Sequence, residues 1–264
     1  MQSAITPLIL TLNETPNIER TLQQLSWAKD IVVVDSGSTD GTTGILQRYP
    51  NVRVFTRAFT THAEQWNFGL EQTGIKTEWV LALDADFVLS DALVKEVEAL
   101  RPEPGVHGYR ASFVYCIDGK PLRCAVYPPV VVLFRRAGAR YAQDGHTQRV
   151  QVQGRVANLA GTILHDDRKP LAHWLAAQAR YMRLEARKLD ETPAGQLGWA
   201  DRLRLLIVLA PPVMFLCVFV ARGGILDGGA GLYYAAQRTV AEAILSLYLV
   251  QRKLGMRDEQ GARD

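Results

Sequence analysis

The stretch Trp79-Val80-Leu81-Ala82-Leu83-Asp84-Ala85-Asp86 decides the fold. Its apolar residues predict a strand buried on both faces of a sheet, because no charge interrupts the run before Asp84. In an open parallel sheet, ligands bind just beyond the carboxyl ends of the strands. We therefore expect Asp84 and Asp86 at the rim of a ligand-binding crevice.

These two carboxylates predict a metal site. Carboxylates are hard oxygen donors that suit Mg²⁺ or Mn²⁺ when the phosphates of a substrate supply further oxygens. Both side chains lie on the same side if the strand continues as far as Asp86. The alternative is a solvated turn, because Asp is common in turns. The Asp-x-Asp spacing alone leaves both interpretations open.

Strands and helices alternate around this stretch. Strands are expected at residues 5–12, 31–35 and 52–55, and helices after Pro16, up to Tyr49 and over residues 62–72. This alternation predicts right-handed crossovers and an α/β fold, with a mostly parallel sheet covered on both faces.

The loop after the second strand predicts a ligand contact. Asp35 ends that strand and is suited to accept hydrogen bonds from a base or ribose, while Ser36 and Gly37 allow a ligand close to the backbone. The loop has neither the Gly-Lys-Ser/Thr of a P-loop nor the Gly-x-Gly-x-x-Gly of dinucleotide sites. An ordinary strand-to-helix turn that ends in an N-cap is the alternative.

Composition narrows the class of protein. The chain has 264 residues, 48% of them hydrophobic and 22% charged, which is typical of one globular domain with or without an appendage. The net charge of +3, without a basic and aromatic stripe, argues against a nucleic-acid partner. The three cysteines form no ligand pattern, and their odd number favours a reducing compartment. Residues 1–12 lack a basic region before their apolar residues, so we expect a first strand there and no signal peptide.

Three motifs together resemble the family-2 glycosyltransferases of the GT-A fold. They are Leu-Thr-Leu-Asn-Glu at residues 10–14, Ile-Val-Val-Val-Asp-Ser-Gly-Ser-Thr-Asp-Gly-Thr at residues 31–42 and Leu-Asp-Ala-Asp at residues 83–86. The resemblance covers residues 4 to about 190 and looks closest to the bacterial lipopolysaccharide-core glucosyltransferase type. It implies a Rossmann-like mixed sheet flanked by helices and a nucleotide-sugar donor, most often a UDP-sugar.

The same resemblance implies roles for single residues. Glu14 and Asp35 would hold the nucleoside, Asp84 the base and ribose side, and Asp86 the metal and diphosphate. The other nucleotide-binding positions that it implies are Leu12, Ser36, Gly37, Arg57 and Asn67. Asn67 is equally compatible with an amide on a helix surface.

The following half is expected to bind the acceptor. A helix to about residue 100 and strands over residues 106–116 and 127–135, with a turn at Asp118-Gly119, predict an antiparallel extension. An inverting transfer needs a base that takes the proton of the acceptor hydroxyl. Many relatives have Val-His-Glu where this chain has Gly-His-Thr-Gln, so the usual Glu is missing. We expect Asp144 to be the base and His146 to be the second candidate; a plain turn there is the alternative.

A polar segment after the next apolar run supplies further candidates. His165 is expected to complete the metal coordination or to steady the diphosphate, and Arg168 and Lys169 suit anionic phosphates. Alternatively, the neighbouring acids favour the dipole of the helix that follows. On that helix, Gln178 and Arg180 faintly resemble the Gln-x-x-Arg-Trp motif of processive relatives and are candidates for the acceptor or diphosphate. Packing explains most of that pattern, and processive synthesis is not inferred.

Residues 205–221 contain no charge. As one helix they would reach roughly 25 Å, short of a hydrocarbon core of about 30 Å, and Pro211-Pro212 interrupts them. We expect a re-entrant hairpin or short helices lying in the membrane interface, followed by a helix with an apolar stripe from Leu232 to Val250. A soluble helical hairpin that covers the catalytic domain or forms a homodimer is the alternative.

These expectations combine into one hypothesis. Residues 1–200 form a glycosyltransferase domain with a nucleotide-sugar half (1–100) and an acceptor half (101–200), and residues 201–264 associate with the membrane. The enzyme is metal-dependent and inverting, and acts on a lipid-linked saccharide or lipopolysaccharide-core acceptor at the cytoplasmic face of a bacterial inner membrane. One alternative is a sugar-phosphate nucleotidyltransferase, which usually has a Gly-rich, Arg-containing loop after the first strand. The other is a catalytically silent nucleotide-sugar-binding scaffold.

Overall fold

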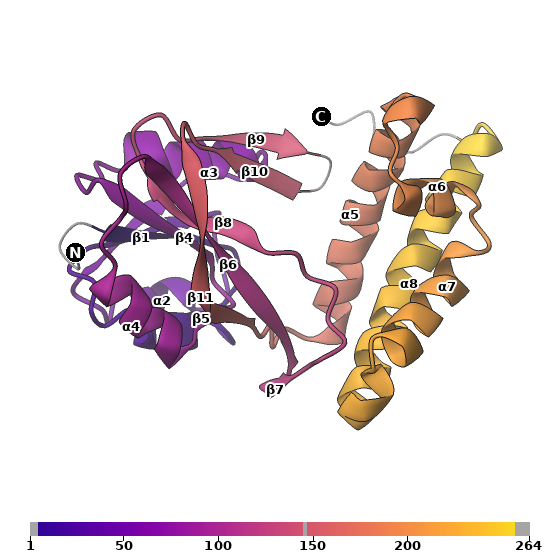
Figure 1. The fold of residues 1–264 in the computed structure, drawn as a ribbon, viewed down its shortest axis with the longest axis horizontal. Helices are drawn as coiled ribbons and strands as arrows, with labels where there is room; N and C mark the ends of the chain where they lie inside the picture. The colour runs from indigo at the N-terminus through magenta and orange to yellow at the C-terminus, as the bar shows by residue number, and fades with distance from the viewer. Residues whose placement is uncertain (1–4, 145–146, 257–264) are drawn as a thin grey trace. The chain divides into compact units, whose positions relative to one another are not determined.

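The chain divides into two compact units in a computed structural model that describes residues 5–144 and 147–256 (Figure 1). The sheet unit comprises Met1–Pro121 and Tyr127–Lys169, and the helical unit comprises Leu122–Val126 and Pro170–Asp264. The expected boundary at residue 200 lies inside the helical unit. The division of function between residues 1–200 and 201–264 stays a prediction.

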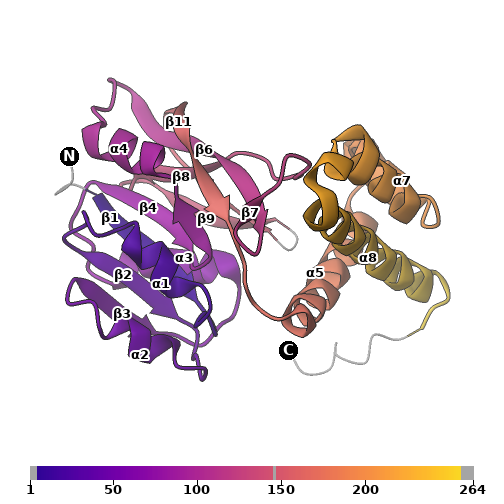
Figure 2. The same cartoon turned by 90° about the horizontal axis from the view of Figure 1, so that it is seen from below.

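Four parallel strands form one half of the main sheet. They are β1 (Ile5–Thr11), β2 (Ile31–Asp35), β3 (Val52–Thr56) and β4 (Trp79–Asp84), and the helices α1 (Ile18–Gln23), α2 (Thr42–Leu46) and α3 (His62–Gln72) connect them. Their order is β3-β2-β1-β4 (Figure 2). Leu10 is in register with Asp84, and Thr11 with Asp35, so the two carboxylates leave the sheet at the same edge.

The other half of the sheet is antiparallel at three of the four junctions that run from β4 to β5. Its strands are β5 (Phe87–Leu89), β6 (Val106–Ile117), β7 (Lys120–Pro121), β8 (Val130–Arg135) and β11 (Arg155–His165), and α4 (Asp91–Ala99) follows β5. The order continues β4-β8-β6-β11-β5, with β8 antiparallel to both neighbours, β6 and β11 parallel, and β5 antiparallel to β11. The α/β class and the mixed sheet with flanking helices are therefore confirmed, whereas a mostly parallel sheet describes only the first half.

Two short features belong to this half. The expected turn at Asp118-Gly119 is confirmed: both residues have positive φ, 49° and 78°, as a type I′ hairpin turn requires. Strands β9 (Arg140–Asp144) and β10 (Thr147–Gln151) form a separate two-stranded sheet. The sequence analysis made no prediction of strands for these residues.

Alternating side chains of the central strands build a core on each face of the sheet. Val33 of β2 and Leu83 of β4 pack with Leu22 of α1 on one face. On the other face, the neighbouring residues of these strands pack against α3. That helix lies very close to β1, because a Cβ on Gly69 would come within 2.7 Å of Leu8 Cδ1. The buried β4 run is thus covered on both faces, as its lack of charge predicted.

The helical unit packs around two long helices. Its elements are α5 (Leu171–Glu191), η2 (Ala194–Gln196), α6 (Trp199–Leu205), α7 (Ala210–Leu216), the π-helical turn η3 (Cys217–Ala221), η4 (Gly224–Asp227) and α8 (Gly228–Lys253). Met182 and Leu189 of α5 are buried against Leu245 and Leu249 of α8. Pro211 lies in the first turn of α7 and not in the middle of a helix, so α6 and α7 are separate helices.

A buried ion cluster joins three helices of this unit. The Arg204 guanidinium lies 3.0 Å from Glu242 Oε1, 3.4 Å from Glu185 Oε1 and 3.3 Å from Asp201 Oδ1. The side chains of Glu185 and Glu242 are only 7% and 2% exposed. Buried carboxylates need such a partner, because an unpaired buried charge costs several kcal/mol, about 3–5.

The inserted segment Leu122–Val126 is held by the residues before α8. Asp227 Oδ2 accepts hydrogen bonds from the backbone N–H groups of Arg123 (2.9 Å) and Cys124 (3.2 Å). Arg222 Nη2 donates to the carbonyl oxygen of Ala125 at 2.8 Å. These bonds explain why this piece of the loop between β7 and β8 belongs to the helical unit.

Several apolar side chains on the helical unit face solvent. Trp199, Val208 and Leu226 are 81%, 77% and 73% exposed. Within the described part of the chain, no one helix has the length and apolar character to cross a bilayer. Taken together, Ala210–Ala221 and Gly224–Lys253 are long and apolar enough, but the two segments are bent by 66° relative to each other. The expected membrane association stays a prediction.

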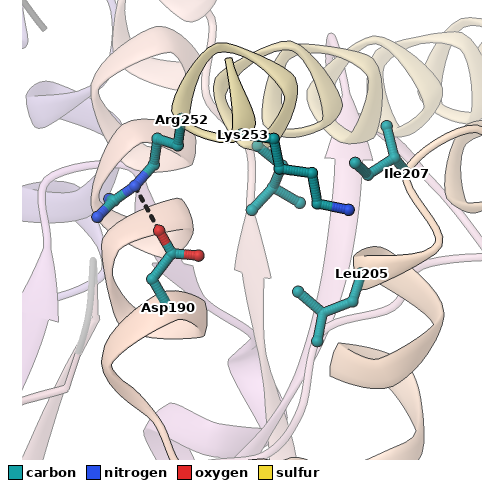
Figure 3. A pocket seen from close by; sticks show the side chains of 6 residues that line it. Asp190, Leu205, Ile207, Arg252 and Lys253 are labelled. Carbon is teal, nitrogen blue, oxygen red and sulfur yellow. Dashed lines mark ion pairs between the residues drawn. The ribbon is translucent and has the colours of Figure 1, made fainter. Parts of the chain in front are cut away.

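A pocket in this unit contains none of the predicted site residues. It is lined by Asp190, Leu205, Ile207, Leu249, Arg252 and Lys253 (Figure 3). Arg252 forms an ion pair with Asp190 at its edge. Most of the predicted site residues lie in the sheet unit.

Candidate active site

Strand pairing brings Asp86 and His165 together. Strand β5 follows Asp86 directly and pairs with the end of β11, where Phe87 is in register with His165. As a result, Asp86 Oδ2 lies 3.0 Å from His165 Nε2, and the N–H of Asp166 donates to the Asp86 carbonyl at 3.2 Å. Asp86 and His165, both predicted metal ligands, are therefore neighbours.

Aromatic rings surround His165. The ring centroids of Phe87, Tyr115 and Tyr127 lie 5.1, 4.8 and 5.1 Å from that of the imidazole. Burial opposes protonation of His165, but the charge and hydrogen bond of Asp86 outweigh it and raise the pKa of the imidazole. Burial also opposes ionisation of Asp86, yet His165 lowers the pKa of that carboxyl. The pair therefore favours an ionised Asp86.

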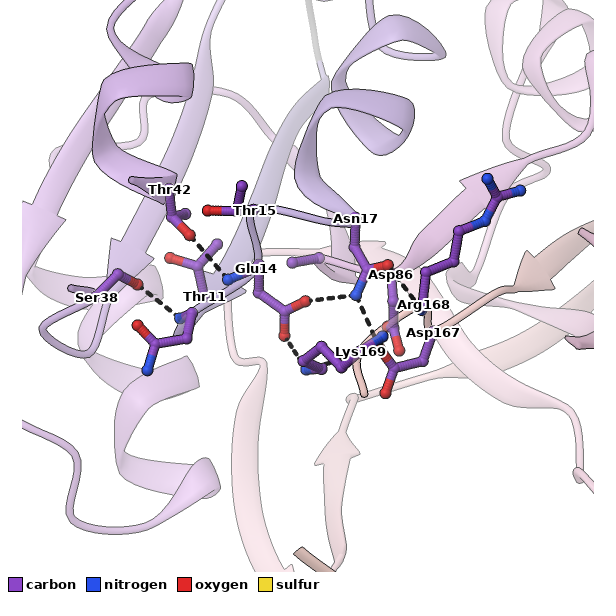
Figure 4. A network of polar contacts seen from close by, with 12 residues as sticks. Thr11, Glu14, Thr15, Asn17, Ser38, Thr42, Asp86, Asp167, Arg168 and Lys169 are labelled. Carbon is purple, nitrogen blue, oxygen red and sulfur yellow. Dashed lines mark hydrogen bonds and ion pairs between the residues drawn. The ribbon is translucent and has the colours of Figure 1, made fainter. Parts of the chain in front are cut away.

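A second pair forms beside it (Figure 4). Lys169 Nζ donates to Glu14 Oε1 at 2.5 Å, and Asn17 Nδ2 donates both to Glu14 Oε2 (2.8 Å) and to Asp167 Oδ1 (2.9 Å). Burial and the negative charge of Asp86 nevertheless raise the pKa of Glu14 to about 7, against the opposing effect of Lys169. Lys169, whose side chain is 13% exposed, is thus the cation paired with Glu14.

Asp84 adds a further carboxylate to this edge. Burial and the charge of Asp86 raise the pKa of Asp84 to about 7, although His165 and Lys169 oppose the shift. Glu14, Asp84 and Asp86 thus share two cations, Lys169 and His165. We call these five residues the acid cluster. Its negative charge is incompletely compensated, which favours an additional cation.

The donor set of the acid cluster suits a divalent ion that also binds phosphates. Asp86 Oδ2 and His165 Nε2 are hydrogen-bonded to each other at 3.0 Å, so a divalent ion bound to both atoms would take the place of the shared proton. Among residues 5–144 and 147–256, no group of three or more His, Cys, Asp or Glu side chains is placed to hold a metal ion by itself. Mg²⁺ usually takes one or two protein carboxylates and leaves other positions to water and substrate phosphates. The residues present fit such an ion.

Arg168 lies outside the acid cluster. Its Nε and Nη2 atoms bind Asp166 Oδ2 at 3.0 and 2.9 Å, and Arg20 Nη1 binds the same oxygen at 2.6 Å. Asp166 Oδ1 accepts from the Gly119 N–H at 2.9 Å. Arg168 therefore braces the end of β11 in this conformation. Its expected contact with the diphosphate stays a prediction.

Sequence reasoning missed Asn17, Arg20 and Asp166 as parts of this edge. Asn17 Oδ1 accepts from Arg20 Nη2 at 2.8 Å and from the Arg168 N–H at 3.0 Å. The only signal in the sequence was an Asn at the start of α1, which normally predicts a side-chain cap for its own helix. Asn17 makes no such cap and instead binds residues of the distant β11 segment.

The loop after β2 is held by its own hydrogen bonds. Asp35 is 1% exposed, and its Oδ1 accepts from Thr11 Oγ1 (2.9 Å) and Ser38 Oγ (2.5 Å). Its Oδ2 accepts from the N–H groups of Gly37 and Ser38, both at 2.9 Å. A carboxylate has about four lone-pair positions, so the loop and Thr11 of β1 together use all of them. The Ser36 hydroxyl accepts from Gln65 Nε2 at 2.8 Å.

The other predicted nucleotide contacts also have protein partners. Arg57 Nη1 donates to Gln65 Oε1 at 2.5 Å and lies near Glu64. Asn67 binds both backbone groups of Tyr141 in β9. Leu12, just after β1, is 37% exposed. Nucleotide contact by Leu12, Ser36, Gly37, Arg57 and Asn67 stays a prediction.

The expected base lies at the edge of the described structure. Asp144 ends β9, and its backbone pairs with that of Thr147. Its side chain and the whole of His146 lie outside the described residues, so neither assignment is tested. Gln178 and Arg180 lie on α5 of the helical unit, with the Arg180 guanidinium 6.0 Å from the Tyr181 ring centroid. Their roles also stay predictions.

Comparison with known proteins addresses the class of enzyme. Residues 7–122 match the model of the family described as glycosyl transferase family 2. A Rhizobium meliloti (strain 1021) protein named lipopolysaccharide core biosynthesis glycosyltransferase LpsC is 28% identical over 253 residues, which cover 88% of each chain. An uncharacterised glycosyltransferase of Rickettsia bellii (strain RML369-C) is 29% identical over 144 residues, 52% of this chain and 48% of that one.

Solved structures resemble the chain more distantly. S. aureus TarS 1–349 in complex with UDP-GlcNAc aligns over 97% of this chain and 93% of its own, with a TM-score of 0.47 and 15% identity. The family match covers Glu14, Asp84 and Asp86. Residues 7–122 thus match a glycosyl transferase family 2 domain, and this match together with the Rhizobium meliloti relative supports a glycosyltransferase.

Proposed function

We propose that this glycosyltransferase transfers a sugar from a nucleotide-sugar, most simply a UDP-sugar, with inversion at the anomeric carbon and with a divalent metal at the acid cluster. The observation that supports the proposal is the incompletely compensated charge of Glu14, Asp84 and Asp86 at one edge of the sheet. TarS, a distant structural neighbour, was crystallised with UDP-GlcNAc. A nucleoside diphosphate and its metal bring the charges that such an edge would accommodate.

In the proposed reaction, the acceptor hydroxyl oxygen attacks the anomeric carbon of the donor. The bond between that carbon and the diphosphate oxygen breaks, and the nucleoside diphosphate leaves with the bonding electrons. The acceptor proton passes to the carboxylate of Asp144, with His146 as the second candidate. Direct displacement of this kind inverts the anomeric configuration.

The residues of the acid cluster would divide the remaining work. Asp86 and His165 would hold Mg²⁺ or Mn²⁺, which when bound offsets the negative charge that develops on the departing diphosphate. Asp84 would face the ribose side. Lys169 is a point charge suited to a phosphate oxygen, and Glu14 and Asn17 fix its position.

We further propose a lipid-linked saccharide or lipopolysaccharide-core acceptor at the cytoplasmic face of the bacterial inner membrane. The named role of the Rhizobium meliloti relative supports this acceptor class. The exposed apolar residues Trp199, Val208 and Leu226 of the helical unit support a membrane partner. A homodimer that covers the same residues is the competing explanation.

A donor survey tests the enzymatic part. Purified protein is incubated with UDP-, GDP- and dTDP-sugars, Mn²⁺ and truncated lipopolysaccharide, and release of the nucleoside diphosphate is followed. We expect release with one donor class, loss of release with EDTA, and an inverted linkage in the NMR spectrum of the product. Retained configuration or full activity in EDTA would refute the mechanism.

Vesicle flotation tests the membrane part. Wild-type protein is expected to float with vesicles that contain anionic lipids and to resist extraction by high salt. Val208→Glu and Leu226→Glu are expected to abolish flotation. Phe59→Glu is the matched control, because Phe59 is a 46% exposed apolar residue of the sheet unit. Flotation of all variants alike, or a dimer that those two substitutions dissociate, would count against membrane binding.

A further inference from the structure

Asn67 makes an unusual pair of contacts with β9. Its Nδ2 donates to the Tyr141 carbonyl oxygen at 3.0 Å, and its Oδ1 accepts from the Tyr141 N–H at 2.9 Å. One amide side chain thus occupies both backbone groups of one residue, as a neighbouring strand would do. Asn67 lies on α3, which is adjacent to β9 and β10 (Figure 1).

Ring packing reinforces the same junction. The rings of Trp66 and Tyr141 stack with centroids 5.2 Å apart and planes within 16°, and the Phe134 ring meets Tyr141 edge-on at 6.0 Å. The Ala63 N–H of α3 also donates to Gln143 Oε1 at 3.3 Å. Successive turns of α3 therefore hold consecutive parts of β9.

This junction matters because β9 and β10 do not belong to the main sheet. They pair only with each other in the described topology, so main-sheet hydrogen bonds do not fix their position. Contacts with α3 supply that constraint instead. Tyr141 is 7% exposed, and burial together with the nearby charge of Asp84 raises its pKa. Tyr141 is thus packed against α3 and lies near enough to Asp84 to feel its charge.

We propose that Asn67 is a positioning residue that fixes strand β9, and with it the backbone of Asp144, relative to Asp84. The proposal rests on the proposed function in one respect, the role of Asp144 as the base. It differs from the interpretation by resemblance, in which Asn67 contacts the nucleotide. Loss of the clamp affects the acceptor side of the reaction and leaves donor binding intact.

Hydrogen exchange tests the clamp without any assay of activity. Asn67→Ala removes the acceptor of the Tyr141 N–H, so exchange of that amide and of the following β9 amides is expected to become about tenfold faster. Gln72→Ala is the matched control, because Gln72 is an exposed amide on the same helix. Trp66→Phe keeps a ring against Tyr141 and is expected to have a smaller effect. Unchanged exchange in Asn67→Ala would overturn the proposal.

Steady-state kinetics test the expected effect of the clamp on sugar transfer. For Asn67→Ala, kcat of sugar transfer is expected to fall about 10- to 100-fold, because a displacement near 1 Å can cost that much. The donor KM is expected to stay within about twofold, and donor hydrolysis without acceptor to fall less than transfer. A raised donor KM with unchanged kcat would show a nucleotide contact and overturn the proposal, as would an equal fall in transfer and hydrolysis. Absence of transfer in the wild type would refute the proposed function, while the exchange result would still decide the clamp.

Discussion

Acidic residues at neighbouring strand ends have opposite surroundings in this molecule. At the loop after β2, hydrogen bonds from the loop and from Thr11 satisfy Asp35, and those from Thr15 and Thr42 satisfy Asp40. Burial opposes ionisation of Asp40, but these bonds lower its pKa to about 2. In the acid cluster, burial and mutual repulsion raise the pKa of Glu14 and of Asp84 to about 7.

These surroundings distinguish acidic residues that stabilise the fold from acidic residues that are suited to bind a ligand. A carboxylate with a full set of donors stabilises the fold and gains nothing from a further partner. A carboxylate that is desolvated and repelled by its neighbours is stabilised by an incoming cation. By this criterion Asp35 holds the loop, whereas the acid cluster is the proposed site of the substrate and its metal. Substitutions of Asp86, Asp35 and Glu14 test this distinction.

The largest expected effect is on catalysis by Asp86→Asn. Removal of the carboxylate that lies 3.0 Å from His165 is expected to lower transfer by a factor on the order of 10³. The rise in Tm on addition of Mn²⁺ and UDP should disappear as well. Asp91→Asn, an exposed acid at the start of α4, is the control for charge. A full Mn²⁺-dependent rise in Tm in Asp86→Asn would place the metal elsewhere.

Asp35→Asn is expected to act on stability and not on binding. The Asn amide would present N–H groups to one pair of the four donors around Asp35, at a cost on the order of 2 kcal/mol in the free energy of unfolding. Urea titration measures this loss, and calorimetry with UDP measures binding. If affinity for UDP falls tenfold while stability is unchanged, Asp35 contacts the nucleoside after all.

Much of the fold follows from local patterns in the sequence. The apolar runs that precede Asp35 and Asp84 identify buried parallel strands, and the expected strand at residues 31–35 coincides with β2. The positive φ values of Asp118 and Gly119 agree with the sequence preference of a type I′ turn. These features depend on residues close together in the chain, so the sequence carries their signal.

The contacts of the site do not follow from such patterns. Asp86 and His165 are 79 residues apart, and Glu14 and Lys169 are 155 apart. Their pairing depends on the antiparallel register of β5 with β11, for which no local motif exists. The donors around Asp35 were present in the motif, but spacing could not show that the loop folds back onto its own carboxylate.

The smallest expected effect is a pH dependence of stability. Because the folded pKa of Glu14 is raised from 4.5 to about 7, the folded state binds more protons than the unfolded state between these values. Stability should therefore fall as pH rises from about 4.5 to 7 and then level off. The contribution is of order 1 kcal/mol, since proton sharing with Asp86 and water entry spread the titration.

Glu14→Gln isolates this contribution. The Gln side chain does not ionise, so the decline in stability between these pH values should become shallower than in the wild type. Glu71→Gln is the matched control, because Glu71 is exposed on α3, and it should leave the profile unchanged. Thermal unfolding at several pH values, with and without Mn²⁺, measures the profiles of both variants.

The added stability from Mn²⁺ should grow with pH in the wild type, because protons and the metal compete for the same acids. A profile of Glu14→Gln that matches the wild type would mean that Lys169 already compensates Glu14, and the acid cluster would then hold one unsatisfied carboxylate fewer.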